Sequence, residues 1–199
     1  NYDEASAVLT LSGKGEMQEP VTIMTQDETT GAVTISYSTN AVPWDPFSTQ
    51  IKAVEISDGI TSITRYAFYW LSQLESITIP DSVTTIGKQS FVHCVKLQSL
   101  TFGDDLMSIG EEAFKDCTAL KEIYLSDNLA NVDKSAFSGC EALKDVYYEG
   151  SENEWEEIVI GEDTDSLINA KIHYNYGEEE PWVPDGAFSI SKSGAWVSG

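Results

Sequence analysis

Three cysteines and two histidines are the side chains of this sequence with the clearest potential for catalysis or metal binding. His93 and Cys94 are adjacent, and a histidine beside a cysteine can give an activated thiolate nucleophile. Cys117 and Cys140 follow Cys94 at successive intervals of 23 residues, and no Cys-x-x-Cys pair occurs. With only one further histidine, His173, the sequence gives little support for a zinc site or a serine-type triad.

A column of four aspartates is the second candidate for chemistry, because Asp58, Asp81, Asp104 and Asp127 share the same 23-residue interval. Solenoids that bind calcium use Gly-rich nonapeptides, which are not present here, so a role in backbone turns is favoured. Residues 163–165 match part of a calcium loop but lack its Gly and its later Glu. Weak calcium binding by the acidic tail is left open. No carboxylate pair stands out for glycoside hydrolysis. We therefore predict no catalytic residue, no metal site and no cofactor.

The 23-residue interval belongs to an internal repeat that organises the middle of the chain. Apolar residues recur in six or more columns in the same register over four units, which chance does not explain. The strand column consists of residues 54–56, 77–79, 100–102, 123–125 and 146–148, and the aromatic column of Phe68, Phe91, Phe114 and Phe137.

Each unit begins with a short strand. Residues 53–57 alternate between polar and apolar side chains, so Val54 and Ile56 face inward and Glu55 faces outward. One unit cannot bury its apolar face alone, but stacked units share one core and a parallel sheet with strands about 4.8 Å apart.

The rest of each unit reads as a bend followed by a short helical segment. Val83 and Ile86 are two apolar anchors of the bend. A glycine follows the second anchor in two repeats, Gly87 in this one and Gly110 in the next, and we expect positive φ angles there. Residues 91–97 place Phe, Cys and Leu three positions apart, which fits a short α- or 3₁₀-helix with one inward stripe.

The repeat register separates the adjacent histidine and cysteine. Cys94 falls in an inward column that Leu71 occupies in the first unit, whereas His93 falls in an outward column. We therefore predict that the cysteines are buried thiols acting as small hydrophobic residues. Side chains at equivalent positions run parallel, which keeps their Cβ atoms too far apart for disulfides.

The repeat resembles one leucine-rich-repeat family closely. The segment from Val83 to Phe102 reads V-T-T-I-G-x-x-S-F-x-x-C-x-x-L-x-x-L-x-F, which resembles the BspA-like, or Treponema pallidum type, leucine-rich repeat. Segments near residues 9–17 and 51–54 are similar to its N-terminal cap, and 148–155 and 170–174 to its C-terminal closing segment. The sequence departs from the pattern at Leu71, Thr64 and Asp133, and by an insertion near residues 18–42.

We predict an α/β repeat fold: a short right-handed leucine-rich-repeat solenoid with a parallel β-sheet on its concave face and a cap at each end. The units are 23 residues long. Residues 21–24 and 32–37 are expected to form a β-hairpin, and 154–159 an amphipathic helix whose Trp155 closes the last turn. The expected divisions are an N-terminal cap at 1–53 with the inserted hairpin (18–42), repeats at 54–148, a C-terminal cap at 149–176, and an acidic linker and tail at 177–199.

Charge excludes several classes of partner. Of 199 residues, 33 are acidic and 11 basic, giving a formal net charge of −22, so binding to nucleic acids or anionic membranes is not expected. No apolar run reaches the roughly 18 residues of a membrane span. Residues 149–199 carry 12 acids against 2 bases. We expect this charge to keep the module soluble, and it does not indicate a particular partner. The chain begins at Asn1 without an apolar leader, which suggests a trimmed fragment.

The concave face is the most informative surface for function. Tyr124 and Tyr147 occupy equivalent outward positions of neighbouring strands, where they are suited to ligand contact or to cross-strand stacking, and the two roles are compatible. Tyr69 and Trp70 form a second candidate patch, for which cover by the hairpin is the favoured alternative. The candidate binding residues on the concave face are Thr78, Thr101, Glu122, Tyr124, Asp145 and Tyr147.

The resemblance implies a secreted or surface-anchored bacterial protein that binds host proteins, other bacteria or polysaccharides. We therefore expect a non-catalytic, monomeric, extracellular recognition or adhesion module with a protein or polysaccharide ligand. The alternatives are a structural spacer in a larger cell-envelope protein and an accessory module of a secreted carbohydrate-active enzyme.

Overall fold

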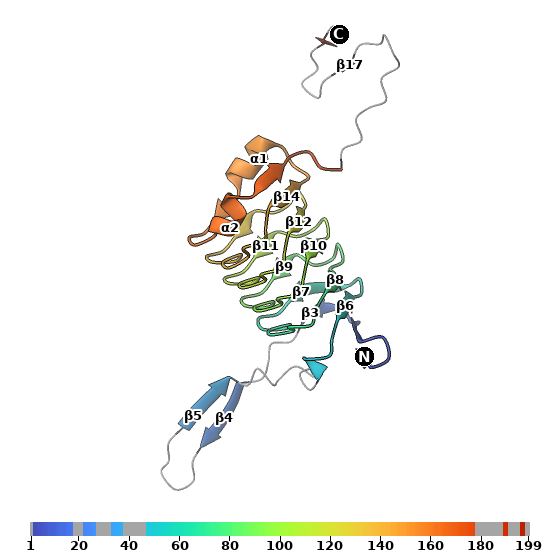
Figure 1. Cartoon of the computed structure of the whole chain (residues 1–199), viewed down its shortest axis with the longest axis vertical. Helices are drawn as coiled ribbons and strands as arrows, with labels where there is room; N and C mark the ends of the chain where they lie inside the picture. The colour runs from blue at the N-terminus through green and yellow to red at the C-terminus, as the bar shows by residue number, and fades with distance from the viewer. Residues whose placement is uncertain are drawn as a thin grey trace.

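The computed structural model forms a β-solenoid whose turns stack from the N-terminal to the C-terminal cap (Figure 1). The predicted leucine-rich-repeat fold is confirmed. The structure describes residues 2–17, 22–26, 33–37, 47–177, 189–190 and 196–197.

The long-strand sheet contains the strands predicted from the alternating pattern. Its strands are parallel and in register at intervals of 23 residues through the repeats, except that β1 (Tyr2–Asp3) is antiparallel to β2. Its ladder is interrupted between β8 and β10. The remaining strands are β2 (Val8–Leu11), β6 (Ala53–Ile56), β8 (Ser76–Thr78), β10 (Ser99–Thr101), β12 (Glu122–Leu125), β14 (Asp145–Tyr148) and β16 (Lys171–His173).

A second parallel sheet, the short-strand sheet, runs along another side of the solenoid. It was not predicted, because most of its strands are two residues long and coincide with the expected bends. In sheet order its strands are β15 (Val159–Ile160), β13 (Asn131–Val132), β11 (Ser108–Ile109), β9 (Thr85–Ile86), β7 (Ile60–Ile63) and β3 (Gly15–Glu16).

The helical segment expected in each repeat is wrong, because these residues form turns. Residues 65–70, 88–93, 111–116 and 134–139 are turns throughout. Alternate backbone N–H groups donate to the next repeat instead of to their own turn, as from Phe68 to Ser90 (2.7 Å) and from Phe91 to Ala113 (2.8 Å). Bonds between repeats therefore replace the bonds that a helix would form within itself. His93 and its equivalents Trp70 and Asp116 adopt positive φ angles here.

The expectation of positive φ at Gly87 and Gly110 is also wrong, since neither glycine is among the residues with positive φ. Both positions instead require glycine because there is no room for a Cβ atom. A Cβ on Gly87 would lie 2.6 Å from the backbone nitrogen of Arg65, and one on Gly110 would lie 2.9 Å from the carbonyl oxygen of Ile86. The glycines therefore allow the backbones of successive turns to approach closely.

The core confirms the predicted thiol column. Cys94, Cys117 and Cys140 are free and buried. Each thiol donates to a phenylalanine carbonyl of the preceding repeat, at sulfur–oxygen distances of 3.4, 3.2 and 3.1 Å. Burial raises the pKa of Cys117 and of Cys140.

These thiols should therefore resist alkylation while the chain is folded. Iodoacetamide at pH 8 should leave all three cysteines unmodified in buffer and modify all three in urea, because burial keeps the reagent away from every thiol in the folded chain. Mass spectrometry of the intact chain would count the adducts. Rapid modification of any cysteine in buffer would contradict the buried column.

The C-terminal cap closes the core with two short helices. In α1 (Glu152–Glu157), Ser151 and Glu154 form a capping box. Trp155 is half-buried against the core, and its ring centroid lies 5.2 Å from that of Tyr148. Helix α2 (Asp165–Ile168) follows, and β16 then joins the long-strand sheet.

Besides β1 and β2, two further antiparallel strand pairs of the described chain lie outside the repeats. β4 (Thr22–Gln26) pairs with β5 (Val33–Tyr37) in the segment where a hairpin was predicted. β17 (Ser189–Ile190) pairs with β18 (Trp196–Val197), whereas the predicted linker lies outside the described residues after Gly177. The proposed domain boundaries stay a prediction. In the described part of the chain, no helix is long and apolar enough to cross a membrane.

Candidate functional site

Aromatic rings form a stack along the outer face of the long-strand sheet. Tyr124 on β12, Tyr147 on β14 and His173 on β16 are directly paired in register. The centroids of the two tyrosine rings are 4.7 Å apart with an interplanar angle of 9°, and those of Tyr147 and His173 are 4.5 Å apart with an angle of 13°. The rings thus repeat at nearly the spacing of the strands. The cross-strand stacking considered from the sequence is therefore present.

Tyr176 extends this cluster from the segment that follows β16. Its ring centroid lies 5.3 Å from that of Tyr124 and 5.0 Å from that of Tyr147, at angles of 56° and 57°. Its side chain is 45% exposed. The name aromatic cluster is used below for Tyr124, Tyr147, His173 and Tyr176.

Sequence reasoning did not include His173 or Tyr176 in the site. His173 lies 26 residues after Tyr147, because the cap breaks the 23-residue interval. The pairing of Lys171 with Asp145 places His173 on the outer face, and its Nε2 lies 2.8 Å from Oδ1 of Asp145. A match of residues 171–173 to the strand column would have found His173.

A groove of about 510 Å³ adjoins the aromatic cluster. Three of the predicted residues, Thr101, Glu122 and Tyr124, line it, whereas Asp145 and Tyr147 lie on the neighbouring strand β14. Thr78 lies at the end of β8 and is not among the lining residues. The lining residues are Ile79, Asp81, Ser99, Thr101, Phe102, Gly103, Asp104, Glu122, Tyr124, Leu125, Glu149 and Tyr176.

The groove is strongly acidic. Four lining residues are carboxylates, and none of the lining residues is basic. The pKa of Glu149 is raised, first by partial desolvation and then by the carboxylates of Asp104, Asp127 and Asp81. The pKa of Tyr124 is raised as well, first by desolvation and then by Glu122. Both shifts reflect an environment that disfavours additional negative charge.

This raised pKa predicts that Glu149→Gln stabilises the protein at neutral pH. A carboxyl group whose pKa is higher in the folded state favours folding below its unfolded pKa and loses that contribution as pH rises through the folded pKa. The variant should gain less than ~1 kcal/mol at pH 7, because the side chain is exposed and screened, and nothing near pH 3.5. Thermal unfolding at both pH values would test this. Glu141→Gln is the exposed control, and an equal gain in both variants would contradict the electrostatic explanation.

The second predicted patch lies on the turn side of the solenoid. Trp70 is 53% exposed, and its ring centroid lies 4.4 Å from that of His93. Nε2 of His93 lies 3.5 Å from Oδ2 of Asp116. Tyr69 is half-buried, with its ring centroid 6.2 Å from that of Trp70. Trp70 thus packs beside His93 while remaining accessible to solvent.

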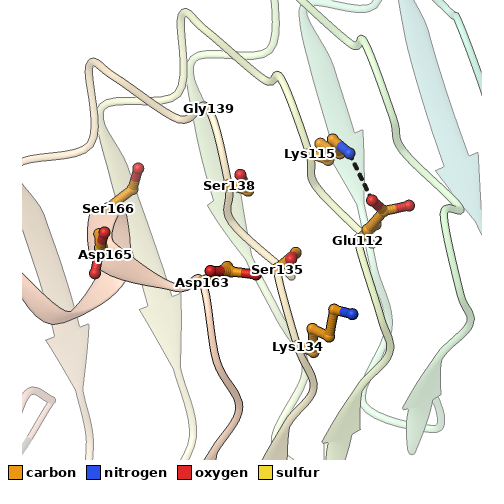
Figure 2. A pocket seen from close by; sticks show the side chains of 9 residues that line it. All are labelled: Glu112, Lys115, Lys134, Ser135, Ser138, Gly139, Asp163, Asp165 and Ser166. Atoms are coloured by element: carbon orange, nitrogen blue, oxygen red, sulfur yellow. Dashed lines mark hydrogen bonds and ion pairs between the residues drawn. The ribbon is translucent and has the colours of Figure 1, made fainter.

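Figure 2 shows a second hollow, of about 500 Å³, where the turns meet the C-terminal cap. Nζ of Lys115 lies 2.5 Å from Oε1 of Glu112, and this pair lowers the pKa of Glu112. Lys134, Asp163, Asp165 and several serine hydroxyls also line the hollow, so its lining carries both positive and negative charges. Among the described residues, no three His, Cys, Asp or Glu side chains are grouped to hold a metal ion.

The stacked turns, with parallel strands repeated at 23-residue intervals, define a leucine-rich-repeat protein. The model of the BspA type leucine-rich repeat region matches residues 47–160 in six copies, so the chain belongs to this family. No curated protein matches the chain.

Solved structures of bacterial leucine-rich-repeat proteins resemble this chain at low identity. A Eubacterium ventriosum protein is 19% identical with a TM-score of 0.50, over 75% of this chain and 41% of its own. The T. pallidum leucine-rich-repeat protein is 20% identical with a TM-score of 0.46, over 62% and 66%. A leucine rich cell surface protein of Faecalibacterium prausnitzii is 18% identical with a TM-score of 0.46, over 94% and 54%. This chain therefore spans about two fifths of the E. ventriosum protein.

Proposed function

We propose that this chain is a non-catalytic, monomeric recognition module that acts outside the bacterial cell or on its surface and binds a protein or polysaccharide. The aromatic cluster beside the groove carries the proposal. Tyrosine provides a large contact area with few rotatable bonds, so ordering it on binding costs little entropy. Family membership supports a role in recognition, and the extended face of stacked repeats is suited to it.

The proposal predicts that Tyr124→Ala plus Tyr147→Ala removes most of the ligand affinity. Central aromatic contacts typically contribute ~2 kcal/mol or more to binding, so the dissociation constant should rise at least about tenfold. Wild type and variant would first be screened on a glycan array and a panel of matrix proteins, and each hit measured by biolayer interferometry.

The matched control is Tyr69→Ala plus Trp70→Ala, which also removes two aromatic side chains but on the turn side. Circular dichroism would establish that both variants are folded. Loss of binding in the control alone would assign recognition to the second patch and overturn the proposal. Failure of the wild type to bind anything in either screen would favour the spacer.

A further inference from the structure

The aromatic stack ends abruptly at Tyr124. One face of the Tyr124 ring packs against Tyr147, and the opposite side of the ladder continues to Thr101, which pairs directly with Tyr124. Threonine has no ring, so the stack cannot continue on β10. The residues equivalent to Tyr124 on the successive strands β6 to β16 are Glu55, Thr78, Thr101, Tyr124, Tyr147 and His173.

The space above Thr101 belongs to the groove, since Thr101, Ser99 and Tyr124 all line it. The stacked rings are 4.5 to 4.7 Å apart, and their planes are within 13° of parallel. A flat group placed over Thr101 would therefore meet the free face of Tyr124 as the next member of the stack. Stacking on a ring in this position would favour a flat group.

Charge narrows the choice of planar group. Glu122 lies on the same strand as Tyr124, and Glu149, Asp104 and Asp81 also line the groove. A neutral sugar or aromatic ring would leave these carboxylates without a cationic partner, and an ammonium group is not flat. A guanidinium is planar, cationic, stacks on aromatic faces and donates paired hydrogen bonds to carboxylates.

We propose that the groove binds an arginine side chain of a partner protein, with the guanidinium stacked on the free face of Tyr124 and donating to Glu122 or Glu149. This inference rests on the proposed function and names the chemistry of its ligand. The partner presents the arginine on an exposed segment, because the groove is open at the surface and lies beside the exposed Tyr176.

The test is an NMR titration of the 199-residue chain with three short acetylated, amidated peptides that differ at one central residue. Arginine supplies planarity and charge, citrulline planarity alone, and lysine charge alone. We expect the arginine peptide to bind at least about threefold more tightly than the lysine peptide, with no saturable binding of the citrulline peptide. Raising the salt concentration should weaken binding of the arginine peptide.

Two variants probe the space above Thr101 without removing a large buried group. Thr101→Tyr extends the stack with the side chain that the next two strands already carry. The variant should therefore fold and fill this space, which would abolish arginine binding. Glu122→Gln keeps the side-chain shape and should weaken binding by roughly threefold to tenfold. Trp70→Ala is the distant aromatic control and should leave binding unchanged.

Equal binding of the citrulline and arginine peptides, absence of arginine-peptide binding, or full arginine binding by Thr101→Tyr would each overturn the inference. The proposed function would survive any of these results if a protein or glycan ligand still depended on Tyr124 and Tyr147. The two ideas therefore fail on different measurements.

Discussion

Phe114→Ala is expected to lower the free energy of unfolding by ~3–5 kcal/mol, the range found for truncation of large buried aromatic side chains. Phe114 is fully buried at the centre of the aromatic column. Its ring stacks at centroid distances of 4.9 Å on Phe91 and 5.3 Å on Phe137, and Phe102 meets it edge-on at 5.7 Å. Neighbouring repeats hold the cavity open, because bonds between turns fix the backbone on both sides.

Urea unfolding followed by circular dichroism would measure this loss. Met107→Ala is the control, because Met107 is also apolar but 54% exposed, and it should change stability by less than about 0.5 kcal/mol. A single transition at the wild-type midpoint would contradict the central role of the phenylalanine column.

The parts of the fold that repeat were predictable from the sequence. Each unit meets the same environment above and below, so equivalent residues such as Phe91 and Phe114 must satisfy the same packing requirement. The 23-residue interval therefore predicted the strands, the inward cysteines and the phenylalanine column, and all three are present in the structure.

The turns and the short-strand sheet were not predictable in the same way. A strand of two residues, such as β9, has no alternation to detect. The turn residues show apolar spacing like that of a short helix, but alternate backbone N–H groups donate to the next repeat. Side-chain periodicity indicates which residues are buried and does not show where backbone hydrogen bonds go.

The candidate site was likewise predictable only where its residues belong to the repeat. Tyr124 and Tyr147 lie in the repeat and could be paired from the sequence, whereas His173 and Tyr176 follow the cap, where the interval changes. The groove depends on Glu149 and Tyr176 coming together after the last repeat. That the tyrosines stack is a property of the structure, and that they bind a ligand stays a prediction.

Gly103→Ala is expected to destabilise the protein by at least ~1–3 kcal/mol, which is the usual cost of forcing extra atoms into a packed core. Gly103 is buried and follows shortly after β10. A Cβ there would lie 2.3 Å from Cα and 2.4 Å from the nitrogen of Asp81, and 2.5 Å from the carbonyl carbon of Pro80. These are backbone atoms of the preceding turn, so no side-chain rotation relieves the overlap.

Gly13→Ala separates this steric cost from the general effect of replacing glycine. A Cβ on Gly13 meets no atom within 4 Å, and neither glycine has a positive φ angle, so this variant should unfold like the wild type or slightly later. Thermal and urea unfolding of both variants would give the difference directly. If Gly103→Ala were as stable as Gly13→Ala, adjacent turns would have to separate at little cost. The close stacking of backbones would then not be what requires glycine in this repeat.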